Sequence, residues 1–288
     1  MTKKRFLIST TAVLLLVATI LAMFSIIGVQ QSGHIAYAQE DDGFISNSVE
    51  PNENDANYLN LDGNDIGNNG NSIYDSLAFM RKIHSDKKNL SISIVKSKVL
   101  SVTQFSQTVL NRTYNLNHNA NINGTCGCVA LSTLTYYFSH NLVNYPNLPK
   151  NINDIFEEYV QMYGLVGNEG TYSNTYKTKL KEYFQRYGYD MKTERTTALY
   201  KFTKMRDHAD GNRPTIISVS GSQPYGNHAM VVVGYITYNV TYKNWLGITS
   251  NKEETMFVID EGWGRGKYAY LHEDYMPKDW EITNIWKA

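Results

Sequence analysis

The stretch GTCGCVALSTLTYYF, residues 124–138, contains the only two cysteines of the 288-residue chain. Cys126 and Cys128 are separated by one residue, so a disulfide between them would close a very small, strained ring. Structural disulfides normally join spaced cysteines, and a domain of roughly 200 residues buries enough core to fold without one. The two thiols are therefore better explained by reactivity or metal binding than by a structural disulfide.

The residues after the cysteines have apolar positions at helical spacing, which predicts a buried helix whose first turn carries both thiols. Pro146 prevents this helix from continuing beyond the segment SHNLVNYP. A helix N-terminus has partial positive charge and free N–H groups, which stabilise a thiolate and can also bind an oxyanion. This stretch is thus able to supply a nucleophile and half of an oxyanion hole.

A nucleophilic thiolate needs a base, and the base needs a group that orients it. His228 opens HAMVVVGY, which has strand character, and it follows the loop GSQPYGN, from which a side chain can project into a cleft. Residues 256–259 read as another strand, which Asp260 ends just before the turn-forming GWG. A carboxylate at this position can accept the Nδ1–H of an imidazole and fix its tautomer. The chain therefore holds candidates for a base and for its orienter.

This order of motifs resembles the papain-like cysteine peptidases, in particular bacterial branches such as streptopain and the peptidases that process double-glycine leader peptides. In secreted relatives from Gram-positive bacteria, the nucleophile lies in a Cys-Gly-x-x-Ala stretch followed by Tyr-Tyr. The family histidine precedes a Val-rich strand ending in Gly-Tyr, and an Asn or Asp precedes Gly-Trp-Gly. The matching positions are Cys126, Gly127, Ala130, Tyr136, Tyr137, His228, Gly234, Tyr235, Asp260, Gly262, Trp263 and Gly264, within about residues 110–275. The resemblance implies a catalytic triad of Cys126, His228 and Asp260, with Trp263 shielding the histidine and its orienter.

The resemblance leaves two candidates for the nucleophile. In streptopain-like members the nucleophile directly precedes Val-Ala, which is the position of Cys128. In leader-peptidase-like members it precedes Gly, which is the position of Cys126. The Gly after Cys126 and the Gly-Thr before it favour Cys126, and Cys128 remains the alternative nucleophile.

The oxyanion hole departs from the family pattern. The family usually places a Gln a few residues before the nucleophile, where its amide completes the oxyanion hole, and no Gln precedes Cys126 at that spacing. The segment NHNANINGTC offers Asn119, Asn121 and Asn123 instead. An Asn amide donates in a similar way with a shorter reach, and we predict Asn121 as the donor.

Two other interpretations of the cysteines are a pair of buried core thiols and a metal site shared with His228. A structural zinc ion needs four ligands, usually from two close pairs, and the chain has no second pair of cysteines. We therefore predict no metal and no cofactor. The remaining histidines have no comparable context and are predicted to be surface residues: His84, His118, His140, His208 and His272.

The N-terminal region has the parts of a secretory signal peptide: Lys3, Lys4 and Arg5, an apolar run, and an A-x-A site ending at Ala38. We predict a signal peptide over residues 1–38, with an uncleaved membrane anchor as the alternative. Residues 39–75 are rich in Asn, Asp, Glu and Gly and contain no Lys or Arg, which is typical of a disordered linker or the start of a propeptide.

The formal net charge of zero conceals an asymmetry. The first 75 residues contain three basic and nine acidic side chains, which leaves 24 basic and 18 acidic ones after them. This mildly basic region has no basic cluster, so nucleic acid is not a predicted partner.

Residues 111–288 suit one domain, and helical patterns followed by strand patterns indicate an α+β class. The resemblance implies a papain-like, two-lobed fold, with the nucleophile helix in a helical N-terminal lobe and an antiparallel β-sheet in the C-terminal lobe. Residues 76–110 read as a short helix and an alternating strand, which is either a propeptide or the entry to the domain.

We predict a secreted or cell-surface cysteine peptidase that hydrolyses peptide bonds through a thioester, as a monomer with a peptide or protein substrate. It has no stable membrane association once the signal peptide is removed. The alternatives are an inactive papain-like binding module at the cell surface, and a thiol acyltransferase or amidase that uses the same residues.

Overall fold

The computed structural model of this chain describes residues 45–46, 72–197, 200–222, 226–264, 268–273, 276 and 279–288. The chain divides into two units, Met1–Glu40 and Asp41–Ala288, and all described residues belong to the second. The predicted signal peptide lies outside the described residues, as does most of the predicted linker. Among the helices that the structure describes, none is both long and apolar enough to cross a membrane.

The second unit combines helices, mostly in its first half, with strands, mostly in its second half. The helices are α2 (Ser72–Ile83), α3 (Gln107–His118), α4 (Cys126–Asn141), α5 (Ile152–Tyr163), the short 3₁₀ helix η1 (Ser173–Thr175), α6 (Tyr176–Arg186) and α7 (Lys201–Asp210). The strands are β1 (Ile45–Ser46), β2 (Lys88–Val99), β3 (Thr171–Tyr172), β4 (Met191–Thr196), β5 (Thr215–Ser222), β6 (Gly226–Lys243), β7 (Thr249–Asp260), β8 (Ala269–His272) and β9 (Asp279–Lys287).

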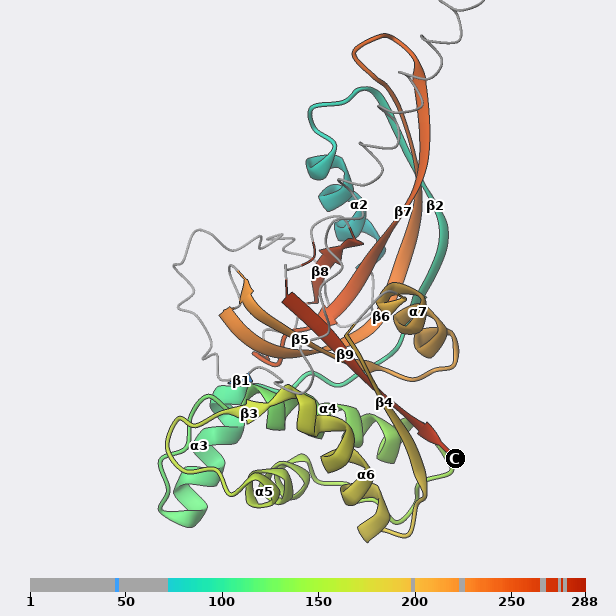
Figure 1. Ribbon diagram of the computed structural model, residues 1–288. Helices are drawn as coiled ribbons and strands as arrows, with labels where there is room; N and C mark the ends of the chain where they lie inside the picture. The colour runs from blue at the N-terminus through green and yellow to red at the C-terminus, as the bar shows by residue number, and fades with distance from the viewer. Residues whose placement is uncertain are drawn as a thin grey trace, which may run out of the picture. The chain divides into compact units, whose positions relative to one another are not determined.

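Helix α4 is the centre of the helical layer, which also contains α3, α5 and α6 and lies against one face of the large sheet (Figure 1). Its residues Leu131, Leu134 and Phe138 are buried in the core that the helices share with the sheet. At roughly 1.5–3 kcal/mol for each buried large apolar side chain, this burial fixes the helix in place. The helix ends when Leu142 adopts an extended conformation, before Pro146.

The large sheet has seven antiparallel strands in the order β4-β9-β5-β6-β7-β8, with β2 added to β6. Strand β6 changes partners along one edge, because its first part pairs with β5 and its second part with β2. Gly234 lies opposite Val99 of β2, where a side chain would overlap the carbonyl oxygen of Lys98. The close approach of β2 therefore explains the glycine in HAMVVVGY.

The run HAMVVVGY is continuously apolar because both faces of β6 are buried. Val231 and Val233 belong to the core shared with the helical layer, whereas Met230 and Val232 belong to the core shared with α7. This arrangement confirms the α+β class and the papain-like combination of a helical lobe with an antiparallel sheet. The start of β6, where His228 lies, is consequently held in a rigid part of the sheet.

The segment between residues 76 and 110 forms α2, β2 and the start of α3. Strand β2 pairs with β6 from Lys88 to Val99, so it is a strand of the large sheet. Helix α2 buries Phe79 and Met80, and the hydroxyl of Tyr238 on β6 donates a hydrogen bond to Ser76. The removal of residues 39–110 as a propeptide stays one of the two alternatives stated from the sequence.

Three of the histidines that were predicted to be surface residues are buried. His84, His208 and His272 are 8%, 6% and 1% exposed, which corrects the prediction for these positions. His118 and His140 are exposed, as predicted. His84 follows α2 and His208 lies on α7, two helices that pack on the sheet, whereas His272 lies on the sheet strand β8. A single histidine in a polar segment gives no signal of such packing.

Candidate active site

Cys126 is the first residue of α4, and both cysteines are buried. The preceding Thr125 turns its hydroxyl to Oδ1 of Asn111 on α3, to which it donates a hydrogen bond of 2.5 Å. Within the described residues, Thr125 makes no side-chain cap on α4. Thr125 therefore does not supply the side-chain acceptor that often caps the first N–H groups of a helix.

Gly127 allows the start of α4 to pack tightly against a neighbouring segment. A side chain at Gly127 would overlap Oγ1 of Thr171 and the hydroxyl of Tyr176. These two oxygens are themselves hydrogen-bonded at 2.8 Å and buried. The Cys-Gly pair thus reflects a close contact between α4 and the segment of β3 and α6.

The two cysteines point in different directions from α4. Cys128 is fully buried, and burial raises the pKa of its thiol well above the usual value. Burial also raises the pKa values of Tyr114, Tyr159 and Tyr163 on α3 and α5, with a smaller contribution from Cys128 to each. Cys126 instead shares its helix face with Val129, one turn further on.

The imidazole of His228 lies in a fully buried position at the start of β6. Its Nε2 is 2.8 Å from the backbone oxygen of Glu261, so Nε2 carries the hydrogen and donates it. The ring of Trp263 stacks on the imidazole, with 4.8 Å between ring centroids and 23° between planes. Burial lowers the pKa of His228 to about 4, although the bond to Glu261 acts in the opposite direction.

Asp260 is buried at the end of β7. Its Oδ1 accepts a hydrogen bond of 3.1 Å from the backbone N–H of Gly262, whereas its Oδ2 has no hydrogen-bond partner among the described residues. Burial raises the pKa of Asp260 to about 7, and the neighbouring Glu261 contributes to the rise. The carboxylate thus shapes the turn from which the Glu261 carbonyl reaches His228. The contact predicted between Asp260 and Nδ1–H requires the other tautomer, because the neutral ring carries its hydrogen on Nε2 here.

The turn after Asp260 contacts two helices. Gly262 has a φ of +76°, and a Cβ placed on it would lie 3.2 Å from Cγ1 of Val129 on α4. Its carbonyl oxygen accepts a hydrogen bond of 2.8 Å from the backbone N–H of Gln107, the first residue of α3. Trp263 pairs with Ser106 in an isolated antiparallel bridge. The turn that holds His228 therefore lies against the face of α4 that carries Cys126.

Gln107 is a candidate residue that the sequence did not reveal. It is 2% exposed, and it lies one helical turn before Asn111, which bonds Thr125 next to Cys126. The predicted oxyanion donor Asn121 is exposed. The family pattern places the Gln a few residues before the nucleophile, and Gln107 does not fit this spacing because all of α3 separates it from Cys126.

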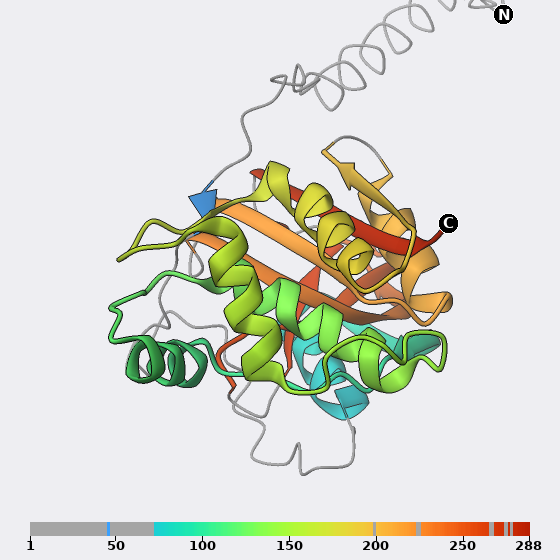
Figure 2. The same ribbon diagram turned by 90° about the horizontal axis from the view of Figure 1, so that it is seen from below.

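A short extended segment lies beside the start of α4. Strand β1 pairs with β3 in antiparallel register, with Ser46 opposite Thr171 (Figure 2). Thr171 is the residue that abuts Gly127. The backbone of β1 also lies close to β5 and β6. Two residues from the predicted linker thus occupy a position between the helical layer and the strands, next to Cys126 in the fold.

Comparison with protein families gives one match. The model of the Peptidase_C39 like family matches residues 99–270, which is more than half of the chain. This protein therefore belongs to the Peptidase_C39 like family, which indicates a cysteine peptidase. No curated protein matches the chain. No solved structure matches it either.

Proposed function

We propose that this protein is a secreted, monomeric cysteine peptidase in which Cys126 is the nucleophile and His228 is the base. One observation carries the proposal: Val129, on the same helix face as Cys126, packs on Gly262, in the turn whose carbonyl holds Nε2 of His228. These two contacts hold α4, which carries the nucleophile, and the imidazole in a defined relative position. Both cysteines are buried, but the position of Cys126 as the first residue of α4 and the raised pKa of the Cys128 thiol favour Cys126 over the alternative nucleophile.

The tautomer of His228 defines the first step. Since Nε2 donates its hydrogen to Glu261, we assign Nδ1 as the ring nitrogen that accepts the thiol proton of Cys126. The sulfur attacks the carbonyl carbon of the substrate, and the carbonyl electron pair moves onto oxygen. The proton on Nδ1 then passes to the amide nitrogen as the C–N bond breaks, which releases an amine and leaves a thioester on Cys126.

Hydrolysis of the thioester uses the same groups in reverse. Nδ1 of His228 accepts a proton from water as the water oxygen attacks the thioester carbon. The C–S bond breaks, the proton returns to sulfur, and a carboxylic acid leaves. No cofactor takes part in this sequence, and the net reaction consumes one water for each amide bond.

Asp260 and Trp263 act as positioning residues in this proposal. Oδ1 of Asp260 holds the N–H of Gly262 and so aims the Glu261 carbonyl at Nε2. The buried carboxylate also favours the imidazolium that forms when His228 takes a proton. The Trp263 ring covers one face of the imidazole and keeps water from the bond between Nε2 and Glu261.

The oxyanion of the tetrahedral intermediate needs donors close to Cys126. The N–H groups in the first turn of α4 supply one side, because Thr125 does not cap them. Gln107 is better placed for the other side than Asn121, because it is buried and its backbone N–H donates to Gly262, in the turn that contacts Val129 of α4. We therefore propose the Gln107 amide as the second donor.

The substrate of the proposed enzyme is an extended peptide. Strand β1 provides an example within the chain, because its backbone pairs with β3 directly beside Gly127. A peptide substrate that adds a strand to β3 in the same way would pass its carbonyl groups across Cys126. In the intact chain β1 occupies this position, so we expect its release to precede full activity.

Digestion of an unfolded protein by the purified chain, followed by mass spectrometry, tests the proposal. We expect new carboxyl termini with the wild-type chain and none with Cys126→Ala. Hydroxylamine should divert part of the product to hydroxamates, because it intercepts the thioester. Peptide binding without cleavage would instead indicate the binding module. Transfer of the acyl group to an added amine, at the expense of hydrolysis, would indicate the acyltransferase.

A further inference from the structure

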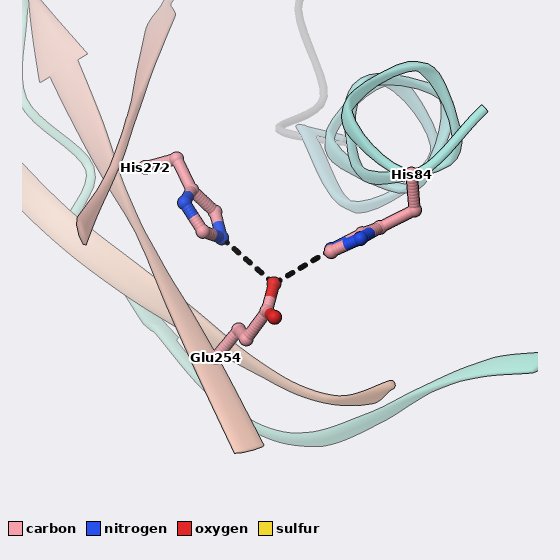
Figure 3. A group of neighbouring side chains, drawn as sticks. All are labelled: His84, Glu254 and His272. Carbon is pink, nitrogen blue, oxygen red and sulfur yellow. Dashed lines mark hydrogen bonds and ion pairs between the residues drawn. The ribbon is translucent and has the colours of Figure 1, made fainter. Parts of the chain in front are cut away.

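A second cluster of buried polar side chains uses none of the residues of the proposed active site. His84, Glu254 and His272 converge from three distant parts of the sequence (Figure 3). Nε2 of His84 lies 2.7 Å from Oε2 of Glu254, and Nε2 of His272 lies 3.0 Å from the same oxygen. The three side chains are 9%, 3% and 1% exposed for His84, Glu254 and His272.

The sheet register places two of these residues together. His272 on β8 lies opposite Met256 on β7, and Glu254 precedes Met256 by two positions. Residues two positions apart on a strand share a face, so Glu254 and His272 are diagonal neighbours on one face of the sheet. This face is the one that α2 covers, because Tyr238, opposite Glu254 on β6, bonds to Ser76 of α2.

The third residue arrives from the end of α2. His84 continues the last turn of the helix, since its backbone N–H donates to Met80. Met80 is fully buried, which fixes the helix end over the sheet. The His84 ring stacks on Tyr242 of β6, with 6.3 Å between centroids and 23° between planes. The imidazole therefore has a defined orientation toward Glu254.

We propose that His84, Glu254 and His272 bind a divalent transition-metal ion of the Zn²⁺ class and so fasten α2 to strands β7 and β8. One donor atom from each residue lies within 4.8 Å of the others. Ligands about 2.0–2.2 Å from a tetrahedral zinc ion lie roughly 3.2–3.6 Å apart, so small side-chain shifts would admit the ion. Two imidazoles and one carboxylate suit Zn²⁺ and exclude Mg²⁺ and Ca²⁺, which prefer oxygen ligands.

The proposed site needs an entry route and a fourth ligand. Lys252 approaches the other carboxylate oxygen of Glu254 at 3.5 Å and is 45% exposed. The half-exposed lysine marks the side from which an ion or a water molecule reaches the carboxylate. Water would complete the tetrahedron, and the displaced lysine would remain in solvent. This site does not depend on the proposed peptidase activity.

Titration with Zn²⁺ by isothermal calorimetry tests the proposal in the full chain carrying Cys126→Ser, which removes the catalytic thiol as a competing ligand. We expect one bound ion per chain. At a free concentration 100 times the dissociation constant, the melting temperature should rise by roughly 5 °C or more. Mg²⁺ at the same concentration should give neither effect. Co²⁺ should give visible bands of nitrogen and oxygen coordination, without a thiolate charge-transfer band.

Variants assign the bound ion to these residues. His84→Ala and Glu254→Gln should each weaken Zn²⁺ binding by at least about 100-fold. The matched control is His118→Ala, which removes an exposed histidine that also contacts a carboxylate, that of Glu157 at 3.1 Å. This control should leave Zn²⁺ binding unchanged. Absence of Zn²⁺ binding, equal affinity in His84→Ala, or a Co²⁺–thiolate band would each overturn the proposal, and the Co²⁺ spectrum decides even if a variant does not fold.

Discussion

The backbone oxygen of Glu261 accepts the Nε2 hydrogen of His228 at 2.8 Å, and this bond fixes the orientation and the tautomer of the imidazole. A main-chain acceptor cannot be changed by a single side-chain substitution. Its position depends instead on the turn that Asp260 closes through Gly262. The proposed catalytic histidine is thus oriented by backbone geometry, with the carboxylate acting on that geometry.

The two candidate oxyanion donors are separated by comparing Gln107→Ala with Asn121→Ala. We expect Gln107→Ala to lower kcat by roughly 10²–10³ with little change in KM, because the donor acts in the transition state. Asn121 is exposed, and its replacement should leave kcat within about twofold. Initial rates on one peptide substrate measure both effects. A large loss in Asn121→Ala with none in Gln107→Ala would restore the assignment predicted from the sequence.

Asp260→Asn should change the pH dependence of stability. Burial raises the pKa of Asp260 to about 7, above the value of 3.8 for an unfolded carboxyl group. Between about pH 4 and pH 7 the folded protein therefore retains a proton that the unfolded chain releases. Burial of the carboxylate lowers the free energy of unfolding most above pH 7 and not at all below pH 4. We expect the free energy of unfolding of Asp260→Asn to exceed that of wild type by on the order of 3 kcal/mol at pH 8, and by little at pH 4.

Urea unfolding of both proteins at several pH values between 4 and 8 measures this difference. Burial lowers the pKa values of His208 and His228 to about 4, so both histidines titrate at the acid end of this range, and the change near pH 7 reports on Asp260. Parallel stability curves for the two proteins would show that Asp260 stays ionised in the folded state.

Gly127→Ala should destabilise the protein by about 1–3 kcal/mol, because the added methyl group overlaps two hydrogen-bonded oxygens. Thr171→Ala combined with Tyr176→Phe removes both oxygens. Adding Gly127→Ala to that pair should therefore cost less than adding it to wild type, and thermal or urea unfolding of the four proteins completes the cycle. An equal cost in both backgrounds would mean that the crowding at Gly127 has another source.

Strand β1 should restrict access to Cys126. Two prolines, in Ile45→Pro/Ser46→Pro, cannot donate to the ladder with β3 and should release the segment. We expect faster alkylation of Cys126 in this variant than in wild type, by roughly tenfold. Asn68→Pro, at another position of the same Asn-rich segment, is the control and should leave the rate unchanged. Identical alkylation rates in all three proteins would contradict the proposal that β1 occupies the substrate site.

Much of the inner fold could be predicted from the sequence, because burial imposes a pattern on it. The apolar spacing after Cys126 predicted α4, and the continuous apolar run of HAMVVVGY reflects a strand buried on both faces. Three strands gave a weaker signal. Strands β4 and β9 were not predicted, because β4 is largely polar and three of the five buried residues of β9 are polar, namely Glu281, Thr283 and Asn284. Strand β7 begins at Thr249 instead of near residue 256, because its first residues are largely exposed and polar.

The candidate site was predictable where chemistry and local structure coincide in sequence, as at Cys126 and His228. It was not predictable where contacts are long-range. Gln107 reaches the site because Gly262 accepts its backbone N–H, and this pairing joins segments far apart in the chain. The convergence of His84 and His272 on Glu254 depends equally on sheet register, which a single sequence does not reveal.

The most direct test of the central claim is the rate of iodoacetamide labelling at each cysteine as a function of pH, resolved by tandem mass spectrometry. An ordinary thiol with a pKa near 8.5 reacts slowly below neutral pH. We predict that Cys126 is labelled between about pH 5 and 6.5 while Cys128 is not, and that His228→Gln moves the Cys126 profile to the ordinary thiol range. Labelling of Cys128 first, or a Cys126 profile centred near pH 8.5 in both proteins, would contradict the account.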